Sequence, residues 1–140
     1  MFNIHEQSLT ADEFIILYNS VGWNSPKKEQ VTLALENSNF TVCIKDEEKP
    51  VGMGRVIGDG ALSFFIKDIA VLPDYQNRGI GRIILNEMIN YIKSSVPSGC
   101  DVCVELISSE GTEPFYEKFG FGKKPGNGMG HGMMTLVVGE

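Results

Sequence analysis

The middle of this chain consists of apolar, β-rich runs that are separated by short polar or glycine-containing turns. The β-rich runs "FTVCIKD" and "PVGMGRVIG" are separated by the polar "EEK", which predicts a hairpin. A "GDG" turn then leads into "ALSFFIKDIAVLP", the longest apolar strand, and a weakly alternating "FNIHEQS" stands at the N-terminus. The pattern predicts an antiparallel meander preceded by one further strand.

Between the first strand and the meander, apolar residues recur at helical spacing. Thr10 and Glu13 have the spacing of a capping box, in which two side chains satisfy exposed backbone N–H groups reciprocally. Ser25 and Pro26 suit the N-cap and first position of a second helix through "KKEQVTLALENS". Two short helices are therefore expected here.

The C-terminal half reads as strand, helix, strand. Ile84, Met88 and Ile92 recur at helical spacing after the meander, and "DVCVELIS" is apolar enough for a strand covered on both faces. A short helix, "TEPFYEKFG", and a last strand, "MMTLVVG", complete the chain. These elements predict a mixed α/β fold in a single domain, 1–140.

The net charge of the chain limits the classes of ligand and partner that are expected. The 12 basic and 18 acidic residues give a net charge of −6, which disfavours nucleic acid and favours a cationic ligand such as an amine. No apolar run approaches the roughly 20 residues of a membrane span, and the N-terminus lacks the basic start and apolar centre of a secretion signal. We therefore expect a cytoplasmic protein without a membrane partner.

The numbers and positions of the cysteines and histidines argue against disulfide bonds and against a metal site. Three cysteines are a poor disulfide framework, and Cys100 and Cys103 precede an apolar strand, so buried packing is expected for both. The two histidines are far apart and have no carboxylate cluster at ligand spacing. No metal site is predicted.

Two glycines at the threshold of a helix, in "QNRGIG", require a reason, because a helical Gly costs roughly 1 kcal/mol relative to Ala. A helix N-terminus attracts anions, and Gly79 and Gly81 leave its amides accessible while Arg78 and Arg82 add charge. A tight turn without a ligand is the alternative. The dinucleotide fingerprint fails because Ile84 occupies the place of its third glycine, and no P-loop motif is present.

These residues carry a resemblance to a known family. The stretch "IAVLPDYQNRGIGRIILNEMINYI" resembles the acetyl-CoA signature of the GNAT superfamily of N-acyltransferases, and "FYEKFGF", 34 residues beyond Gly81, resembles its second signature. The resemblance implies a GNAT fold: a mixed sheet of about six to seven strands with a splayed parallel pair at the cofactor site, and about four helices. The segment from Pro50 to Gly81 is similar to the aralkylamine, plant-type serotonin N-acetyltransferase branch.

The resemblance also implies a cofactor, acetyl-CoA, and the residues that bind it. Ser109 stands where many members carry Asn, and Thr112 where Ala is common, so the contact made by that Asn is in doubt. For the strand residues among them, a plain central strand is the alternative. The implied cofactor-binding residues are Ile69, Ala70, Val71, Gln76, Asn77, Arg78, Gly79, Ile80, Gly81, Arg82, Ser109, Thr112, Phe115 and Tyr116.

Tyr116 matches the general acid of the family, since a phenol is able to protonate a departing thiolate; a core aromatic is the alternative. Asp68 leads Glu105 and His5 as general base, and an ion pair with Lys or Arg is its alternative role. The turn between the first two helices borders the acceptor in the family. The implied substrate-binding residues are Tyr18, Trp23, Asp68 and Glu105.

The function implied is transfer of the acetyl group of acetyl-CoA to a primary amine by direct attack in a ternary complex. A small molecule such as an aralkylamine or a polyamine is the expected acceptor. Two alternatives remain open: a protein lysine or N-terminal acetyltransferase, and a non-catalytic CoA-binding regulatory module. Relatives often dimerise, so a homodimer paired through the last strand is a further expectation.

Overall fold

The computed structural model describes residues 1–126 and 128–140. The chain forms two compact units, Met1–Leu106 and Ile107–Glu140. All five strands of the sheet lie in the first unit, and the short helix of the second signature lies in the second. The prediction of a single domain over 1–140 therefore stays a prediction.

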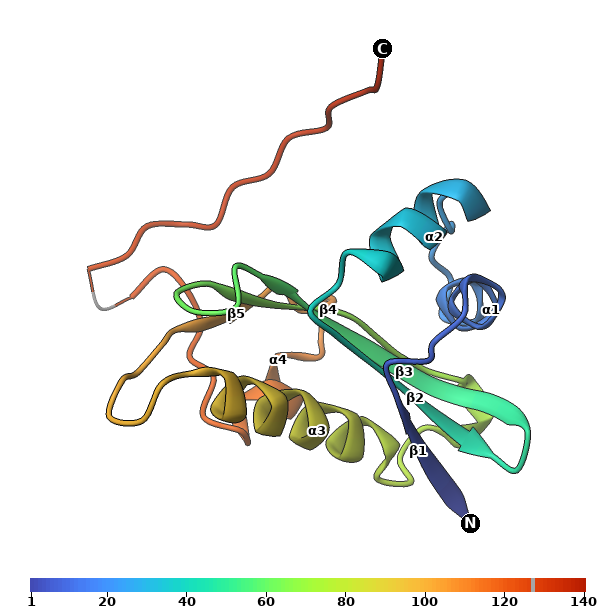
Figure 1. Ribbon diagram of the computed structural model, residues 1–140. Coiled ribbons are helices and arrows are strands. Elements are labelled where there is room, and N and C mark those ends of the chain that lie inside the picture. Colours follow the sequence, from blue (N-terminus) through green and yellow to red (C-terminus); the bar gives the residue numbers. More distant parts are fainter. Residues whose placement is uncertain (127) are drawn as a thin grey trace. The chain divides into compact units, whose positions relative to one another are not determined.

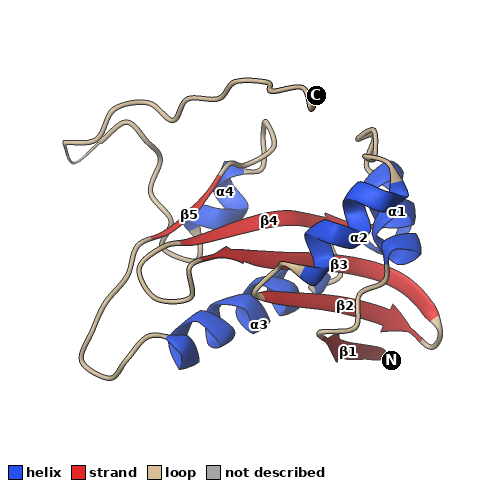
Figure 2. Cartoon of the chain, turned by 45° about the horizontal axis from the view of Figure 1, so that its top comes forward, coloured by secondary structure: helices blue, strands red, loops and turns tan. Residues whose placement is uncertain are grey.

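A five-stranded mixed sheet forms the centre of the first unit (Figure 2). The first four strands pair antiparallel in chain order, and the fifth is parallel to the fourth. The mixed α/β fold, the meander and the parallel pair predicted from the sequence are thereby confirmed. The strands are β1 (Phe2–Glu6), β2 (Phe40–Asp46), β3 (Lys49–Gly58), β4 (Phe64–Val71) and β5 (Val104–Leu106).

Helices cover both faces of this sheet. Figure 1 shows α1 and α2 on one face and α3 on the other. No helix of the described residues is long and apolar enough to cross a membrane. The helical elements are α1 (Ala11–Ser20), α2 (Lys28–Glu36), the 3-10 turn η1 (Pro73–Tyr75) and α3 (Ile80–Ser95), with α4 (Glu113–Glu117) in the second unit.

The start of α1 follows the sequence, whereas the start of α2 does not. Thr10 Oγ1 accepts a hydrogen bond from the Glu13 N–H at 3.2 Å, and Glu13 Oε1 accepts one from the Thr10 N–H at 3.0 Å, which confirms the capping box. Glu13 also pairs with Lys45 of β2 at 2.8 Å. The predicted cap at Ser25 is wrong: Lys27 is the N-cap of α2, and no side chain of the described residues caps it.

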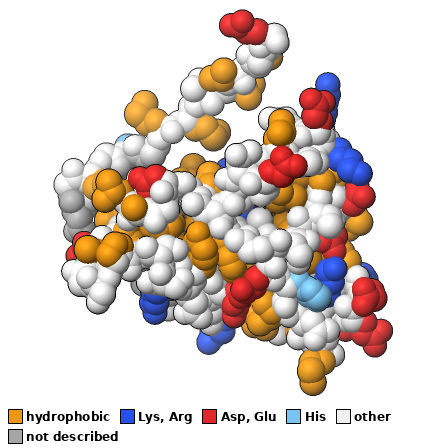
Figure 3. Space-filling model, viewed as in Figure 1, with side chains coloured by type: hydrophobic (Ala, Val, Ile, Leu, Met, Phe, Trp, Pro, Cys, Tyr) orange, Lys and Arg blue, Asp and Glu red, His pale blue; other side chains and the backbone are white. Residues whose placement is uncertain are grey.

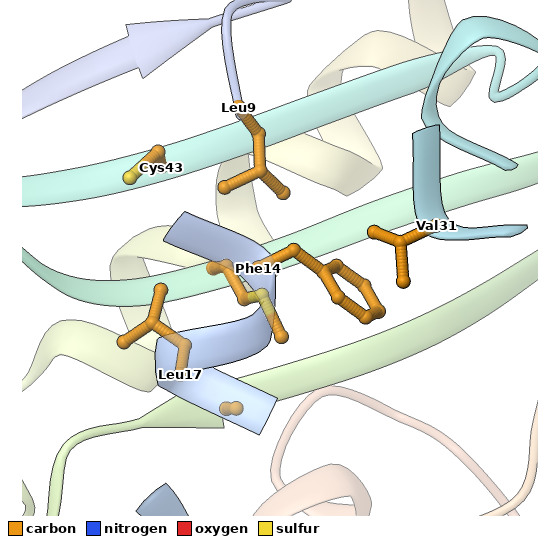
Figure 4. Packing of buried hydrophobic residues seen from close by; sticks show 7 residues of the cluster. Leu9, Phe14, Leu17, Val31 and Cys43 are labelled. Carbon is orange, nitrogen blue, oxygen red and sulfur yellow. The ribbon is translucent and has the colours of Figure 1, made fainter. Parts of the chain in front are cut away.

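Apolar side chains from α1 and α2 meet the sheet in one core cluster, part of which is labelled in Figure 4. Phe14 and Leu17 of α1 and Val31 of α2 pack with Cys43 of β2. Burial raises the pKa of the Cys43 thiol to about 12, so this cysteine remains protonated and unreactive at neutral pH. The other two cysteines, predicted to be buried, are exposed because they precede β5 instead of lying in it.

On the opposite face, α3 lies directly on the backbone of β3. A Cβ atom built on Gly52 would stand 2.8 Å from Ile80 Cγ2, and one on Gly54 would stand 2.7 Å from Met88 Sδ. Real Cβ atoms do not come this close to their neighbours. The two glycines therefore permit the helix to approach the sheet.

The described residues hold five strands, not six or seven. The predicted last strand, "MMTLVVG", has no strand structure, and its apolar side chains are at least 80% exposed. Its β-branched composition favours an extended chain, but a strand also needs partners for its N–H and C=O groups. Composition alone therefore gave one strand too many, and β5 is shorter than the run that predicted it.

The contact at Gly54 gives a first testable prediction. Gly54→Ala is expected to lower the free energy of unfolding by about 1–3 kcal/mol, because the added methyl group forces α3 away from β3. Gly122→Ala is the matched control, since a Cβ there meets nothing within 4 Å. Urea unfolding measures both variants, and equal stability of Gly54→Ala and wild type would contradict the packing described here.

Candidate functional site

The turn between β4 and α3 presents backbone amides without obstruction. Asn77 and Gly79 both adopt left-handed backbone conformations, with φ of 61° and 84°. Gly79 is the N-cap of α3, where no side chain of the described residues makes a capping hydrogen bond. A Cβ on Gly79 would meet nothing within 4 Å, so open space lies beside the helix start. The first amides of a helix lack partners within the helix and carry partial positive charge, and an anion fits this position.

Side chains of this turn bind to the sheet. Gln76 Nε2 donates to the Val71 carbonyl at 3.1 Å. The Arg78 guanidinium lies over the rings of Phe2 and Tyr75, at 5.2 and 4.9 Å from their centroids. Ile80 is 1% exposed and belongs to the core. The turn can therefore offer its backbone to a ligand, whereas these three side chains have structural partners.

The end of β4 has an unpaired edge. Strand β5 pairs with β4 only over Phe64–Ile66. Ala70 and Val71 pair with β3 on the other side, opposite Met53 and Gly52. Among the described residues, no strand pairs with the β5 side of Ile69, Ala70 and Val71. The parallel pair thus diverges where the sequence places the cofactor site.

A β-bulge precedes this edge and carries Asp68. Ala70 pairs with Met53 and Lys67 pairs with Arg55, so two residues of β4 lie opposite the single residue Gly54. Asp68 has a φ of 58°, a conformation that bulges and functional sites tolerate at a cost. The bulge redirects the side chain of Asp68 relative to a regular strand.

Arg55 of β3 is the partner of Asp68. The Arg55 Nε atom lies 2.6 Å from Asp68 Oδ2, and Arg55 Nη1 donates to Ser38 Oγ at 3.2 Å. The two charged side chains are only 14% and 10% exposed. The ion pair predicted as the alternative role of Asp68 is therefore present, and it fixes the orientation of the carboxylate.

Sequence analysis missed Arg55 and Ser38. The available signal was a single arginine, Arg55, within the otherwise apolar, β-rich run "PVGMGRVIG". A buried guanidinium needs a partner such as a carboxylate, and the register of β3 and β4 decides which carboxylate that is.

Two predicted acceptor residues lie on the same face as this ion pair. The Tyr18 ring stacks on Phe14 at 5.2 Å and meets Trp23 edge-on at 5.0 Å. Burial, and then the negative charge of Asp68, raise the pKa of the Tyr18 phenol, while Arg55 opposes the shift. Tyr18, Trp23 and Asp68 are thus brought together. Both aromatic residues also pack against the core cluster, so they have a structural role as well.

The other candidate bases lie elsewhere in the sheet. Glu105 is opposite Phe65, within the paired part of β4 and β5. His5 lies on β1, opposite Cys43 of β2, and strands β2 and β3 separate β1 from β4. Of the three candidates, Asp68 is the one next to the unpaired edge.

Four predicted residues belong to the second unit. Thr112 is the N-cap of α4, and its hydroxyl donates to the Ser109 carbonyl at 2.7 Å. The Tyr116 ring meets Phe115 edge-on at 5.0 Å and Phe121 at 6.0 Å. Burial raises the pKa of the Tyr116 phenol, which keeps its proton at neutral pH.

The charges on the surface are mixed (Figure 3), and a pocket lies away from the residues predicted for the site. Figure 3 shows acidic and basic side chains interspersed on the face in view, without an extended basic area among the described residues. A pocket of about 440 Å³ lies at the C-terminal end of α3, lined by residues such as Ile92, Val96 and Val102. It contains none of the residues predicted for the site.

Comparison with known proteins identifies a family and relatives. The family model for the acetyltransferase (GNAT) domain matches residues 36–123. A crystal structure of a probable acetyltransferase of unknown function from methicillin-resistant Staphylococcus aureus is 33% identical, with a TM-score of 0.87 over 99% of this chain and 100% of that chain.

Two curated relatives are longer than this chain. An uncharacterized N-acetyltransferase of Pyropia yezoensis is 30% identical over 113 residues, 78% of this chain and 63% of the relative. The chloroplastic serotonin N-acetyltransferase 2 of Oryza sativa is 25% identical over 114 residues, 78% of this chain and 54% of that protein. The chain thus spans less than two thirds of their length.

The ion pair gives a second testable prediction. Arg55→Met is expected to lower the free energy of unfolding by about 2–4 kcal/mol at neutral pH, because it leaves the Asp68 carboxylate buried without a partner. The double variant Arg55→Met/Asp68→Asn is expected to recover part of this loss, since no unpaired charge remains. Urea unfolding measures both, with the exposed Lys93→Met as control. Additive losses in the double variant would show that the two side chains do not interact.

Proposed function

This chain belongs to the GNAT family of acetyltransferases, and we propose that it is an acetyl-CoA-dependent N-acetyltransferase acting on a primary amine. One observation carries the proposal most directly. The edge of β4 that lacks a strand partner lies between the open N-terminus of α3 and the face that carries Asp68. Two reactants are therefore able to approach one strand edge from different sides.

The cofactor fits the first of these features. Open space beside Gly79 and the uncapped start of α3 leave room and positive potential for the pyrophosphate, which the backbone from Gly79 to Arg82 would bind. The unpaired backbone of Ile69–Val71 would bind the extended pantetheine arm as a strand edge binds a peptide. The family resemblance assigns further cofactor contacts to Gln76, Asn77, Ser109, Thr112 and Phe115, and these contacts stay predictions.

Acetyl-CoA supplies a thioester whose carbonyl carbon forms the new bond to the amine nitrogen as the bond to sulfur breaks. The residues of this chain handle the protons. The amine reacts in its neutral form, after its ammonium proton has passed to solvent. Asp68 would take the proton that the nitrogen loses as the amide forms; Arg55 holds Oδ2, which leaves Oδ1 for this proton. Tyr116, whose raised pKa keeps the phenol protonated, would give its proton to the departing sulfur. Solvent then takes the proton from Asp68 and returns one to Tyr116, and the products are the acetylated amine and free CoA thiol.

The acceptor class follows from the face that carries Asp68. An aralkylamine combines an aromatic ring, which packs on Tyr18 and Trp23, with an amino group that reaches the Asp68 carboxylate. The net charge of −6 favours the approach of a cation. A relative that carries the name serotonin N-acetyltransferase supports the same class. The acceptor role of Glu105 stays a prediction from the family resemblance.

The homodimer and the cytoplasmic location remain predictions. The homodimer is testable by light scattering of the purified chain. Cytoplasmic location is testable by fractionation of the source cells; the rice relative is chloroplastic by name.

The function is tested by calorimetry with acetyl-CoA, followed by incubation with aralkylamines, polyamines and lysine peptides while thiol release is recorded. Binding and turnover of aralkylamines are the expected result. Turnover of lysine peptides alone would favour the protein acetyltransferase instead. Binding without turnover of any acceptor would favour a CoA-binding module, and absence of binding would contradict the proposal.

Tyr116→Phe gives the third prediction. The variant is expected to bind acetyl-CoA as wild type does and to lose about 100-fold in kcat, because only the proton donor is removed. Tyr91→Phe is the matched control, since Tyr91 stacks on Phe40 of the core and has no assigned role in the reaction. An unchanged kcat in Tyr116→Phe would exclude the acid role.

Asp68→Asn gives the fourth prediction. The variant is expected to lose about 100-fold in kcat at saturating acceptor, because an asparagine amide cannot take the proton from the nitrogen. Calorimetry with acetyl-CoA serves as the control for folding of the variant. A kcat of wild-type size in Asp68→Asn would remove Asp68 as the base.

A further inference from the structure

Three residues at the end of the meander form a row across three strands. Phe2 of β1 is in register with Asp46 of β2, which is in register with Lys49 of β3. Together they form what we call the row platform. It lies at the hairpin end of β2 and β3, where neither the family signatures nor the proposed chemistry requires particular side chains.

Tyr75, the last residue of η1, contacts all three members of the row platform. Its hydroxyl donates to Asp46 Oδ2 at 2.9 Å. Its ring meets the Phe2 ring edge-on at 6.1 Å and lies under the Lys49 ammonium at 5.2 Å. The hydrogen bond to Asp46 is the main cause that raises the pKa of the Tyr75 phenol, so this donor keeps its proton at neutral pH.

Arg78 is held by the same aromatic rings. Its guanidinium lies 5.2 Å from the centroid of Phe2 and 4.9 Å from that of Tyr75. Arginine over aromatic rings is attracted by the ring quadrupole, and its planar group stacks better than a lysine ammonium. The chain from Tyr75 to Arg78 is thus attached to the sheet at both ends.

The attached segment encloses a strained turn. Asn77 has a φ of 61°, and Gly79, directly after Arg78, has a φ of 84°. A left-handed non-glycine residue costs on the order of 1 kcal/mol and persists only where its surroundings hold it. The contacts at Tyr75 and Arg78 are the surroundings that hold this turn.

We propose that Tyr75 and Arg78 are positioning residues that fix the turn Gln76–Gly79 in its ligand-binding conformation through the row platform. Arg78 then acts through the rings of Phe2 and Tyr75 and not by contact with a phosphate, contrary to the direct role that its sequence position suggested. The effect on the cofactor rests on the proposed function. A turn ordered in advance binds more tightly because less conformational entropy is lost on binding.

Substitutions that leave the charge of the turn unchanged provide the test. Phe2→Leu removes one ring, Tyr75→Phe removes only the hydroxyl, and Arg78→Lys keeps the charge without the planar group. Tyr91→Phe is the control for loss of a phenol, because Tyr91 lies on α3 away from the row platform. Amide hydrogen exchange of residues 76–82 in the free protein is measured first, and the Kd of acetyl-CoA, kcat and the acceptor KM are measured next.

Phe2→Leu, Tyr75→Phe and Arg78→Lys are each expected to exchange these amides faster than wild type and to raise the Kd of acetyl-CoA about 3- to 10-fold. In Phe2→Leu and Tyr75→Phe, the values of kcat and of the acceptor KM should remain those of wild type, which general destabilisation would not produce. The double variant Phe2→Leu/Arg78→Lys should raise the Kd of acetyl-CoA by less than the product of the two single effects, since both substitutions remove the contact between Arg78 and Phe2.

Other outcomes separate the two proposals. Wild-type binding by Arg78→Lys, together with unchanged exchange and Kd in Phe2→Leu, would overturn the positioning role and favour a direct phosphate contact. If wild type failed to bind acetyl-CoA at all, the proposed function would fail. In that case faster amide exchange in these three variants would still support the positioning role, and unchanged amide exchange would overturn it.

Discussion

The close approach of α3 to β3 is the constraint on which the arrangement of the first unit depends. Gly52 and Gly54 leave the backbone of β3 bare, and Ile80 and Met88 of the helix occupy the space that side chains would fill. Because Ile80 is the first residue of α3, this packing also sets the position of the helix N-terminus relative to β4. A helix held further from the sheet would still be amphipathic, but its open amides would lie elsewhere.

The end of β4 separates two kinds of chemistry. One face of the sheet carries α3 and its uncapped N-terminus, which suits an anion. The other face carries the bulge, where Asp68 pairs with Arg55 close to Tyr18. Between them runs a strand edge that β5 leaves unpaired. In the proposed reaction, the amine and the acyl donor would reach this strand edge from the two faces of the sheet.

Backbone strain accompanies both features. Asp68 and Asn77 are left-handed residues without the freedom of glycine. Asp68 is held by its contact with Arg55, and Asn77 lies next to Arg78, which is held by the ring of Tyr75. Strain of this kind usually marks functional sites, where a defined geometry matters more than the lowest local energy. The two strained positions flank the unpaired edge of β4.

The elements whose causes are local could be predicted from the amino-acid sequence. The capping box at Thr10, the meander, the amphipathic α3 and the glycine turn before it all follow from residues within a few positions of one another. Local patterns gave wrong predictions where a distant partner is needed, as at the C-terminal run without strand structure and at the exposed Cys100 and Cys103. The pairing of Arg55 with Asp68, the contact of Arg78 with Phe2 and the end of β5 before Ile69 depend on the folded chain. These contacts join residues far apart in sequence, and their energies depend on packing and register, which no short stretch of sequence encodes.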